Sequence, residues 1–194
     1  QSIGKVNSLM ISGGEPLARQ EKAEIINFFY INNHIRYVSI PNNGSLVSRS
    51  VTAINKICKE NPKLYLRIQV SLDSFSKCHD EIRKIPKGFD KAINLITKVK
   101  NLKKTHNNLS IGVNTVLSNF NEKHIESFTD YIAELDLDDH NVEIERPSLG
   151  TLSGNDILIN EGHAYEYFGG KKKDFKKEIA TEKAQAQLIK GKEE

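Results

Sequence analysis

The sequence predicts an α/β protein in which parallel strands form one curved, open sheet, a partial barrel with helices packed outside it. Short apolar runs alternate along the chain with longer stretches of helical periodicity, and regular alternation of this kind favours βαβ units and a parallel sheet. Several apolar runs are also interleaved with polar residues, whereas strands covered by helices on both faces are apolar almost throughout. One face is therefore expected to carry the helices and the other to line a polar cavity. An antiparallel sheet with one solvated face is the alternative, which the intervening helices disfavour.

In the first half of the chain, apolar runs predict strands at 8–12 and 36–40. A helix is expected between them at 18–33, and a second at 48–60 with Val51, Ile54 and Ile57 on one face. The apolar stripe of the first helix comprises Ile25, Ile26, Phe28, Phe29 and Tyr30.

In the second half, the strand expected at 64–72 shows the alternation most clearly. Helices are expected at 89–102 and 122–135, and strands at 109–117 and 142–145. A closed eight-stranded barrel fills its interior with bulky side chains, so polar faces favour an open barrel that holds a ligand. The apolar face of strand 64–72 carries Leu64, Leu66, Ile68, Val70 and Leu72; the polar face carries Tyr65, Arg67, Gln69, Ser71 and Asp73; the next two strands add Ser110, Gly112, Asn114, Glu143 and Glu145.

Composition bounds the size and class of the protein. The 194 residues suit one core domain, expected at 1–150, followed by a charged segment at 151–194 that is helical or disordered. The net charge of +3 is small and gives little support to nucleic acid as a partner. No apolar stretch could span a membrane, which places the protein in the cytoplasm. The two cysteines, Cys58 and Cys78, lie too far apart for a local metal motif.

The sequence Gly13, Gly14, Glu15, Pro16 directly follows the first expected strand. Glycine lets a ligand approach the backbone closely, and proline has no N–H to continue a ladder. An amine could bind the exposed carbonyl groups there, with the Glu15 carboxylate adding a charge-assisted bond. The plainer alternative is a Gly-Gly turn with an acidic residue at a helix N-terminus.

Further polar clusters follow the other strands, and ligands of parallel α/β proteins collect at such carboxyl ends. Small and amide-bearing side chains in these clusters suit a polar metabolite. The clusters are Pro41-Asn42-Asn43-Gly44, Ser71-Leu72-Asp73-Ser74, Asn114-Thr115 and Glu145-Arg146-Pro147.

The residues Gly13 to Pro16 resemble the GGEP motif of radical SAM enzymes, which holds the methionyl amino group of S-adenosylmethionine (AdoMet). Later segments resemble that family in the same order along the chain, from about residue 8 to residue 147. They are Asn42-Asn43-Gly44, similar to T-N-G with Asn42 in place of threonine; Ser71-Leu72-Asp73, similar to S-L-D; His79-Asp80 with Arg83, similar to H-D-x-x-R; Gly88-Phe89-Asp90; and 113–119. The H-D-x-x-R segment and the segment at Gly88-Phe89-Asp90 are similar to ones common in peptide-modifying and SPASM-type members.

The resemblance implies a partial (β/α)6 TIM-like barrel whose first βα unit is missing, with AdoMet as cofactor. Gly13, Gly14, Glu15 and Pro16 would hold the amino group, and Ser71 would bond the carboxylate or the ribose. Asn43, Asp73 and Asn114 would contact ribose or adenine, and Arg83 would pair with the carboxylate. Plainer roles stay open for three of them: a turn at Asn43, a helix cap at Asp73 and a surface ion pair at Arg83. His79 is expected to be a helix-face histidine.

The family's [4Fe-4S] cluster needs a C-x-x-x-C-x-x-C loop, and these residues contain none. The resemblance therefore predicts a fragment that cannot cleave AdoMet alone, from a parent enzyme that forms a 5′-deoxyadenosyl radical for hydrogen abstraction. An unknown substrate, with a peptide as one candidate, and an electron donor such as flavodoxin or ferredoxin would be its partners.

Two other functions remain open. One is a cluster-free relative that binds AdoMet or a partner protein without chemistry. The other is an unrelated α/β barrel enzyme that uses Glu143, Glu145 or Asp73 as acid or base.

Overall fold

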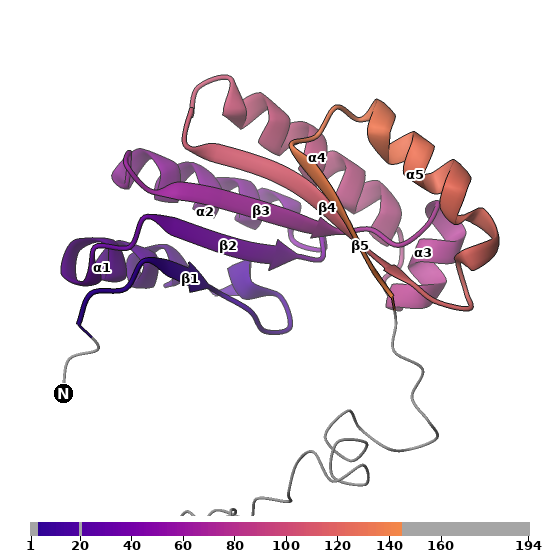
Figure 1. The fold of residues 1–194 in the computed structure, drawn as a ribbon, viewed down its shortest axis with the longest axis horizontal. Coiled ribbons are helices and arrows are strands. Elements are labelled where there is room, and N and C mark those ends of the chain that lie inside the picture. The colour runs from indigo at the N-terminus through magenta and orange to yellow at the C-terminus, as the bar shows by residue number, and fades with distance from the viewer. Residues whose placement is uncertain (1–3, 20, 145–194) are drawn as a thin grey trace, which may run out of the picture. The chain divides into compact units, whose positions relative to one another are not determined.

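One sheet of five parallel strands forms the centre of the computed structural model, which describes residues 4–19 and 21–144. The strands lie in chain order, so each pairs with the next along the sequence. Over the described residues the sheet is open, with the first and last strands at its edges (Figure 1). The strands are β1 (Ser8–Met10), β2 (Tyr37–Asn42), β3 (Tyr65–Ser71), β4 (Leu109–Leu117) and β5 (Asp139–Ile144).

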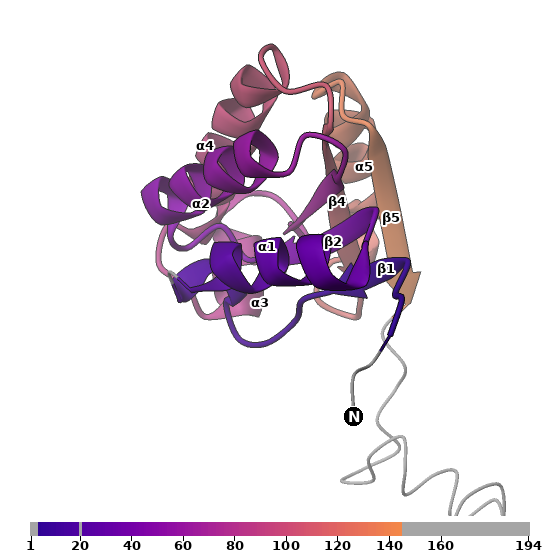
Figure 2. The ribbon, with the colours of Figure 1, turned by 90° about the vertical axis from the view of Figure 1, so that its left-hand side faces the viewer.

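Helices connect consecutive strands and all lie on the same side of the sheet (Figures 1 and 2). This arrangement confirms the predicted α/β class with parallel strands. The helices are α1 (Lys22–Asn33), α2 (Val47–Glu60), α3 (Ser76–Arg83), α4 (Gly88–Lys103) and α5 (Ile125–Glu134), with short 3₁₀ turns at Pro16–Ala18 and Glu122–His124. None of the helices within 4–19 and 21–144 is long and apolar enough to cross a membrane.

The core lies between the sheet and the helices. In β3, Leu66, Ile68 and Val70 are fully buried, whereas Arg67 and Gln69 between them are only partly buried. The alternation read from the sequence therefore reflects burial on one face of this strand and partial exposure on the other. From the helix side, Ile54 and Leu95 pack into the same cluster.

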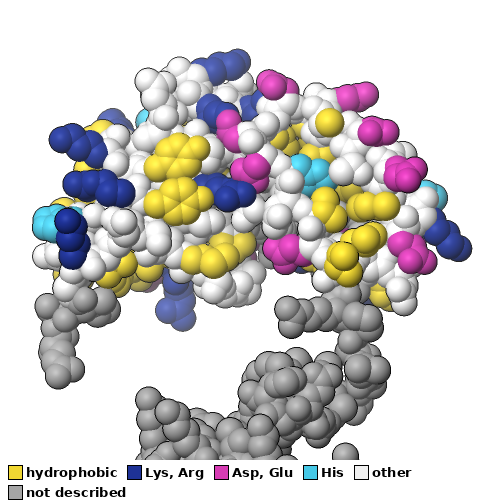
Figure 3. Space-filling model, viewed as in Figure 1, with side chains coloured by type: hydrophobic (Ala, Val, Ile, Leu, Met, Phe, Trp, Pro, Cys, Tyr) yellow, Lys and Arg dark blue, Asp and Glu magenta, His cyan; other side chains and the backbone are white. Residues whose placement is uncertain are grey.

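The face of the sheet that carries no helices is the uncovered face. Side-chain pairs cover its amino-terminal half. Tyr37 and Tyr65, which are neighbours in the β2–β3 register, stack with ring centroids 5.7 Å apart. Arg67 reaches across β4 to Asp139 on β5, with Nη2 and Oδ1 2.6 Å apart. Figure 3, which views this side, shows basic, acidic and hydrophobic side chains side by side. The carboxyl-terminal half of the face therefore remains as the polar part that could receive a ligand.

Several element boundaries differ from the sequence-based expectation. β1 ends at Met10 rather than at residue 12, and β2 extends to Asn42 rather than ending at residue 40. β5 begins at Asp139 rather than at 142, because the pairing of Gly112 with Asp139 continues the ladder through polar residues. An apolar-run criterion misses such residues. The predicted segment at 151–194 and the cluster residues from Glu145 to Pro147 lie outside the described residues.

Candidate functional site

In the loop after β1, the backbone at Gly13 and Gly14 is not covered by side chains. Gly13 has a φ of +141°, in a region that side chains rarely adopt, and a Cβ built at Gly13 or Gly14 would meet no atom within 4 Å. Both glycines are exposed. The space above the loop is therefore open to a ligand that contacts the main chain directly.

The carbonyl groups of this loop are available as acceptors. The last bond between β1 and β2 runs from the Ile11 N–H to the Ser39 carbonyl at 3.0 Å. The next bond of a parallel ladder would come from residue 41, but Pro41 has no N–H to donate. Among the described residues, no hydrogen bond reaches the carbonyl oxygens of residues 11–14. A cationic amine is the kind of group that such a set of acceptors would bind.

Glu15 is fixed between this loop and the next strand end. Its Oε1 accepts from the Leu17 N–H at 3.2 Å, and its Oε2 accepts from the Asn43 N–H at 2.9 Å. Burial raises the pKa of the Glu15 carboxyl, and these two backbone bonds lower it in part. The helix-capping alternative is thus realised, since Glu15 caps the turn at Pro16–Ala18. Each oxygen keeps a further lone pair, so the carboxylate can also face a ligand.

The segment after β2 is a tight turn whose side chains bond their own backbone. Asn42 is buried; its Nδ2 donates to Ser50 Oγ at 3.0 Å and its Oδ1 accepts from the Gly44 N–H at 2.8 Å. Asn43 Oδ1 likewise accepts from the Ser45 N–H at 2.9 Å. The turn role of Asn43 is therefore present, and its contribution to the rim is the N–H that holds Glu15.

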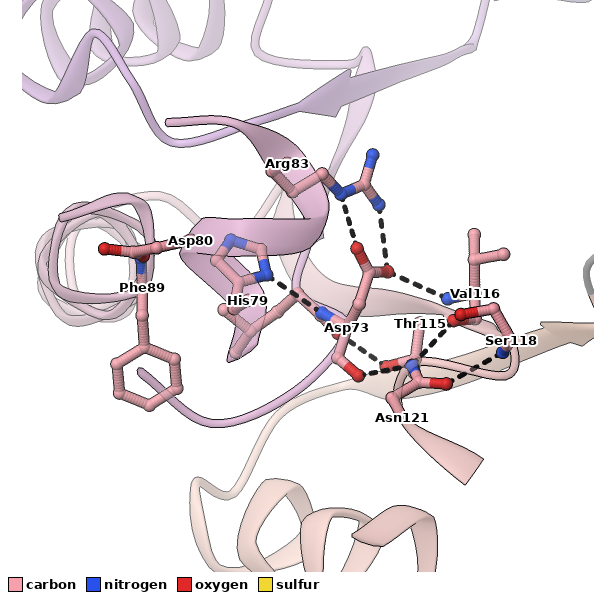
Figure 4. Close-up of polar contacts among 10 residues, drawn as sticks. Asp73, His79, Asp80, Arg83, Phe89, Thr115, Val116, Ser118 and Asn121 are labelled. Carbon is pink, nitrogen blue, oxygen red and sulfur yellow. Dashed lines mark hydrogen bonds and ion pairs between the residues drawn. The ribbon is translucent and has the colours of Figure 1, made fainter. Parts of the chain in front are cut away.

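Asp73 is the centre of the polar network at the ends of β3 and β4 (Figure 4). Its carboxylate pairs with Arg83 through Nε at 2.5 Å and Nη2 at 2.9 Å, and it accepts from the Val116 N–H at 2.9 Å. The residue is 1% exposed. With three N–H groups already on its two oxygens, Asp73 ties two strand ends together.

The main chain of Asp73 is held just as firmly. Its N–H donates to His79 Nδ1 at 3.2 Å, and its carbonyl accepts from Asn121 Nδ2 at 2.7 Å. Asn121 also donates to the Val116 carbonyl and accepts from the Ser118 N–H at 2.7 Å. Sequence reasoning missed Asn121, because nothing in the sequence marks this amide as the buried residue of an otherwise exposed turn.

The H-D-x-x-R segment on α3 now has a structural explanation. His79 is fully buried and faces Asp73, which makes it the helix-face histidine that was expected. Burial lowers its pKa, and because Nδ1 accepts a hydrogen bond, the neutral ring carries its proton on Nε2. Asp80 accepts from the Phe89 N–H at 2.9 Å and so joins α3 to α4. His79 and Arg83 therefore hold Asp73 in place, and Asp80 holds α4 against α3.

Ser71 and Asn114 are direct neighbours on the uncovered face, and Asn141 continues the row on β5. Asn141 Nδ2 donates to Asn114 Oδ1 at 2.8 Å and to Glu143 Oε1 at 3.1 Å. The Nδ2 group of Asn114 is thereby left toward the open face. These side chains present a hydroxyl and an amide donor at the same edge of the sheet as the loop after β1.

The cysteines do not form a metal centre. Cys58 is buried, which raises its pKa to about 12, and Cys78 lies on α3. Over the part of the chain that the structure describes, no three His, Cys, Asp or Glu side chains gather to hold a metal ion. An iron–sulfur cluster needs several cysteine thiolates in one place, so these residues do not fit one.

The fold and site together define a parallel α/β protein with one open polar face and an acceptor-rich glycine loop at its rim. No known family matches the sequence, and no relative is found among curated proteins. Solved structures that are similar in fold include several of anSMEcpe, a radical SAM anaerobic sulfatase maturase.

The structural similarity holds across several forms of that enzyme. With bound AdoMet, the TM-score is 0.55 at 18% identity over 71% of this chain and 35% of the other. With AdoMet and the Cp18Cys peptide, it is 0.53 at 21% identity over 71% and 37%. With AdoMet and the Kp18Cys peptide, it is 0.57 at 17% identity over 80% and 48%. The chain thus spans less than half the length of these neighbours, and the likeness concerns the fold.

Proposed function

We propose that this chain is the AdoMet-binding core of a radical SAM enzyme, forming the second to sixth strands of its partial barrel. The observation that carries the proposal is the loop after β1, where unbonded carbonyl groups and the fixed Glu15 carboxylate surround open space. Similarity in fold to an enzyme with bound AdoMet supports it.

The methionyl amino group would lie at this loop. The carbonyl groups of residues 12–14 would accept its N–H bonds, and Glu15 would add opposite charge at the same point. Glycine at 13 and 14 leaves no side chain in the way. Pro41 contributes because it has no N–H to donate to the β1–β2 ladder. Pro16 contributes because it begins the 3₁₀ turn that follows the loop.

The rest of the cofactor would lie along the rim toward β4. Ser71 and Asn114 offer a hydroxyl and an amide to the carboxylate, ribose or adenine, and the Asn43 turn would border the ribose. Asp73 and Arg83 are engaged with each other, so we assign them to positioning the rim. Arg83 retains unbonded N–H groups on its outer edge.

AdoMet would supply the parent protein with the 5′-deoxyadenosyl group that abstracts hydrogen from the substrate. These 194 residues hold two cysteines, so the ligands of a [4Fe-4S] cluster and the contact with an electron donor would come from outside them. The peptides bound to the structural neighbours make a peptide the favoured substrate class.

Calorimetric titration tests the proposed function. AdoMet should bind more tightly than 5′-methylthioadenosine, which lacks the amine and the carboxylate. Glu15→Gln should weaken AdoMet about tenfold, the size of one charge-assisted bond, and leave methylthioadenosine unchanged. Glu21→Gln, at an exposed position, is the matched control. Equal binding of both ligands by the unmodified chain would contradict the proposal.

A cluster-free protein that binds AdoMet is the second candidate, since the acceptor-rich loop after β1 would bind the amine without a cluster. A C-x-x-x-C-x-x-C loop in the parent reading frame, with 5′-deoxyadenosine formed after reconstitution with iron and sulfide, would support the enzyme. A parent without those cysteines would support the second candidate.

A further inference from the structure

A cleft of about 570 Å³ lies beside the Asp73 network, between α3 and the end of β4. Its helix wall comprises Cys78, Glu81 and Ile82, with Arg83 and Lys84 at the end of the helix. Its other wall is formed by Val116, Ser118 and Phe120, and Asp73 closes the inner end. The proposed binding of AdoMet at the rim does not use this cleft.

The inner end of the cleft offers hydrogen-bond donors. Arg83 uses Nε and Nη2 on Asp73, and its third guanidinium nitrogen points away from that carboxylate (Figure 4). Among the described residues, no acceptor lies on that nitrogen. Lys84 adds an exposed ammonium group next to it. Because Arg83 compensates the charge of Asp73, an incoming carboxylate would meet the free N–H groups of Arg83 and the Lys84 ammonium group.

The walls of the cleft combine apolar side chains with the polar Glu81 and Ser118. Ile82 and Val116 line it, and Phe120 is 75% exposed on the turn after β4. Phe120 thus adds an aromatic ring at the edge of the cleft, against which an apolar group could pack. Glu81 lies on the helix wall and would oppose a second acidic group near the outer end. The cleft therefore suits an apolar group with a carboxylate directed inward.

We propose that this cleft binds an acidic peptide segment, with a carboxylate at Arg83 and Lys84 and a neighbouring apolar side chain against Phe120. Calling that peptide the substrate rests on the proposed function. Peptide binding itself requires neither AdoMet nor a cluster. The peptide-binding proposal and the proposed function can therefore fail separately.

Cys78 supplies a reporter inside the cleft. It is partly exposed, whereas Cys58, the chain's other cysteine, is buried with a pKa of about 12. Thiol reagents act on the accessible thiolate, so N-ethylmaleimide should modify Cys78 first. The rate of that modification, followed by mass spectrometry, measures whether the cleft is occupied.

Three peptides and one small acid form the test. Acetyl-Phe-Glu amide should slow modification about tenfold at ten times its Kd, whereas acetyl-Phe-Lys amide and acetyl-Gly-Glu amide should protect much less. Equal protection by the lysine peptide, or none by any peptide, would overturn the proposal. Equal protection by 4-phenylbutyrate would assign the cleft to small acids and also overturn it.

Charge variants at two matched positions separate binding from folding. Lys84 and Lys87 are both exposed and both have positive φ, at 57° and 55°, but only Lys84 lines the cleft. Lys84→Glu should abolish protection by the acidic peptide, and Lys87→Glu should preserve it, with equal thermal unfolding of both. Glu81→Gln should preserve or strengthen protection. Loss of protection in both lysine variants would contradict the assignment.

Discussion

Asp73 shows how a residue can lie at a predicted site and serve it indirectly. The sequence placed it after a strand as a ligand contact or a helix cap, and the structure gives it contacts with β4, α3 and the turn at Asn121. A buried carboxylate with three N–H donors is a fixed part of the architecture. In the proposed function, Asp73 holds the strand ends that carry Ser71 and Asn114.

Asp73→Asn should destabilise the protein strongly. The substitution leaves Arg83 without its partner, and removing one member of a buried pair costs about 3–5 kcal/mol. Arg83 is 29% exposed, so the lower end of that range is expected. Urea unfolding measures the loss, with Asp90→Asn at an exposed position as control. A change as small as that of the control would show that the pair contributes little.

His79 makes stability depend on pH. Burial holds its pKa below the ordinary value of about 6.5, so the unfolded chain takes up a proton first as the pH falls. Its contribution is complete above that value and is lost as the pH falls through the folded pKa, at up to about 1.4 kcal/mol per pH unit. Burial lowers the pKa of His140 as well, which acts in the same direction.

Urea midpoints at a pH near 7.5 and a pH near 5 measure this dependence. His79→Asn, whose amide oxygen can still accept from Asp73, should flatten the slope and leave the part due to His140. An unchanged slope in the variant would rule out His79 as its source.

Gly14→Ala separates ligand binding from stability. The added methyl group meets no atom within 4 Å and Gly14 does not have a positive φ, so stability should change by no more than about 0.5 kcal/mol. The same methyl group would stand where AdoMet approaches the backbone. Calorimetry should therefore show at least tenfold weaker AdoMet binding with an unaltered melting temperature. Unaltered binding would place the ligand elsewhere.

At the scale of elements, the turn between β2 and α2 depends on α4. Gly44 has a φ of +74°, and a Cβ there would lie 2.7 Å from the Ala92 Cα. Both the backbone conformation and the contact exclude a side chain. The turn that holds Glu15 is thus fixed by α4, which follows it in the chain only after α2, β3 and α3.

Gly44→Ala should therefore destabilise the fold by about 1–3 kcal/mol, the range for strained backbone positions. Thermal unfolding measures the change, and Gly14→Ala is the control. Equal melting temperatures of the two variants would contradict the tight packing of this turn on α4.

Periodicity predicted the strands and helices because burial on one face is a local pattern. The predicted bounds of α2, α4 and β4 agree closely with the observed ones. It failed at β5, where Asp139 and His140 pair with β4 through the backbone while their side chains are polar. Ladder pairing of this kind leaves no periodic trace in the residues themselves.

At the scale of the whole molecule, one face of the sheet carries the helices and the other carries the candidate site. Sequence reasoning found the rim because its residues follow strands in order. It could not find the Asp73 network, since Asn121 lies far along the chain and its contacts depend on the sheet register. It also could not predict the role of Pro41. Pro41 has no N–H, so it does not donate the next hydrogen bond of the β1–β2 ladder.

The chain spans 35% to 48% of its structural neighbours, and the complete reaction is proposed for the parent protein and not for these residues. The part that these residues can show alone is recognition of AdoMet at the rim. That recognition is the central claim, and it does not depend on a cluster.

Amide NMR of the ¹⁵N-labelled chain during AdoMet titration tests the claim most directly. We expect the largest shifts at the backbone amides of Gly13, Gly14 and Glu15 and at the side-chain amide of Asn114, with little change in the helices. A folded chain whose resonances at these residues do not move, or whose shifts gather elsewhere, would contradict the account.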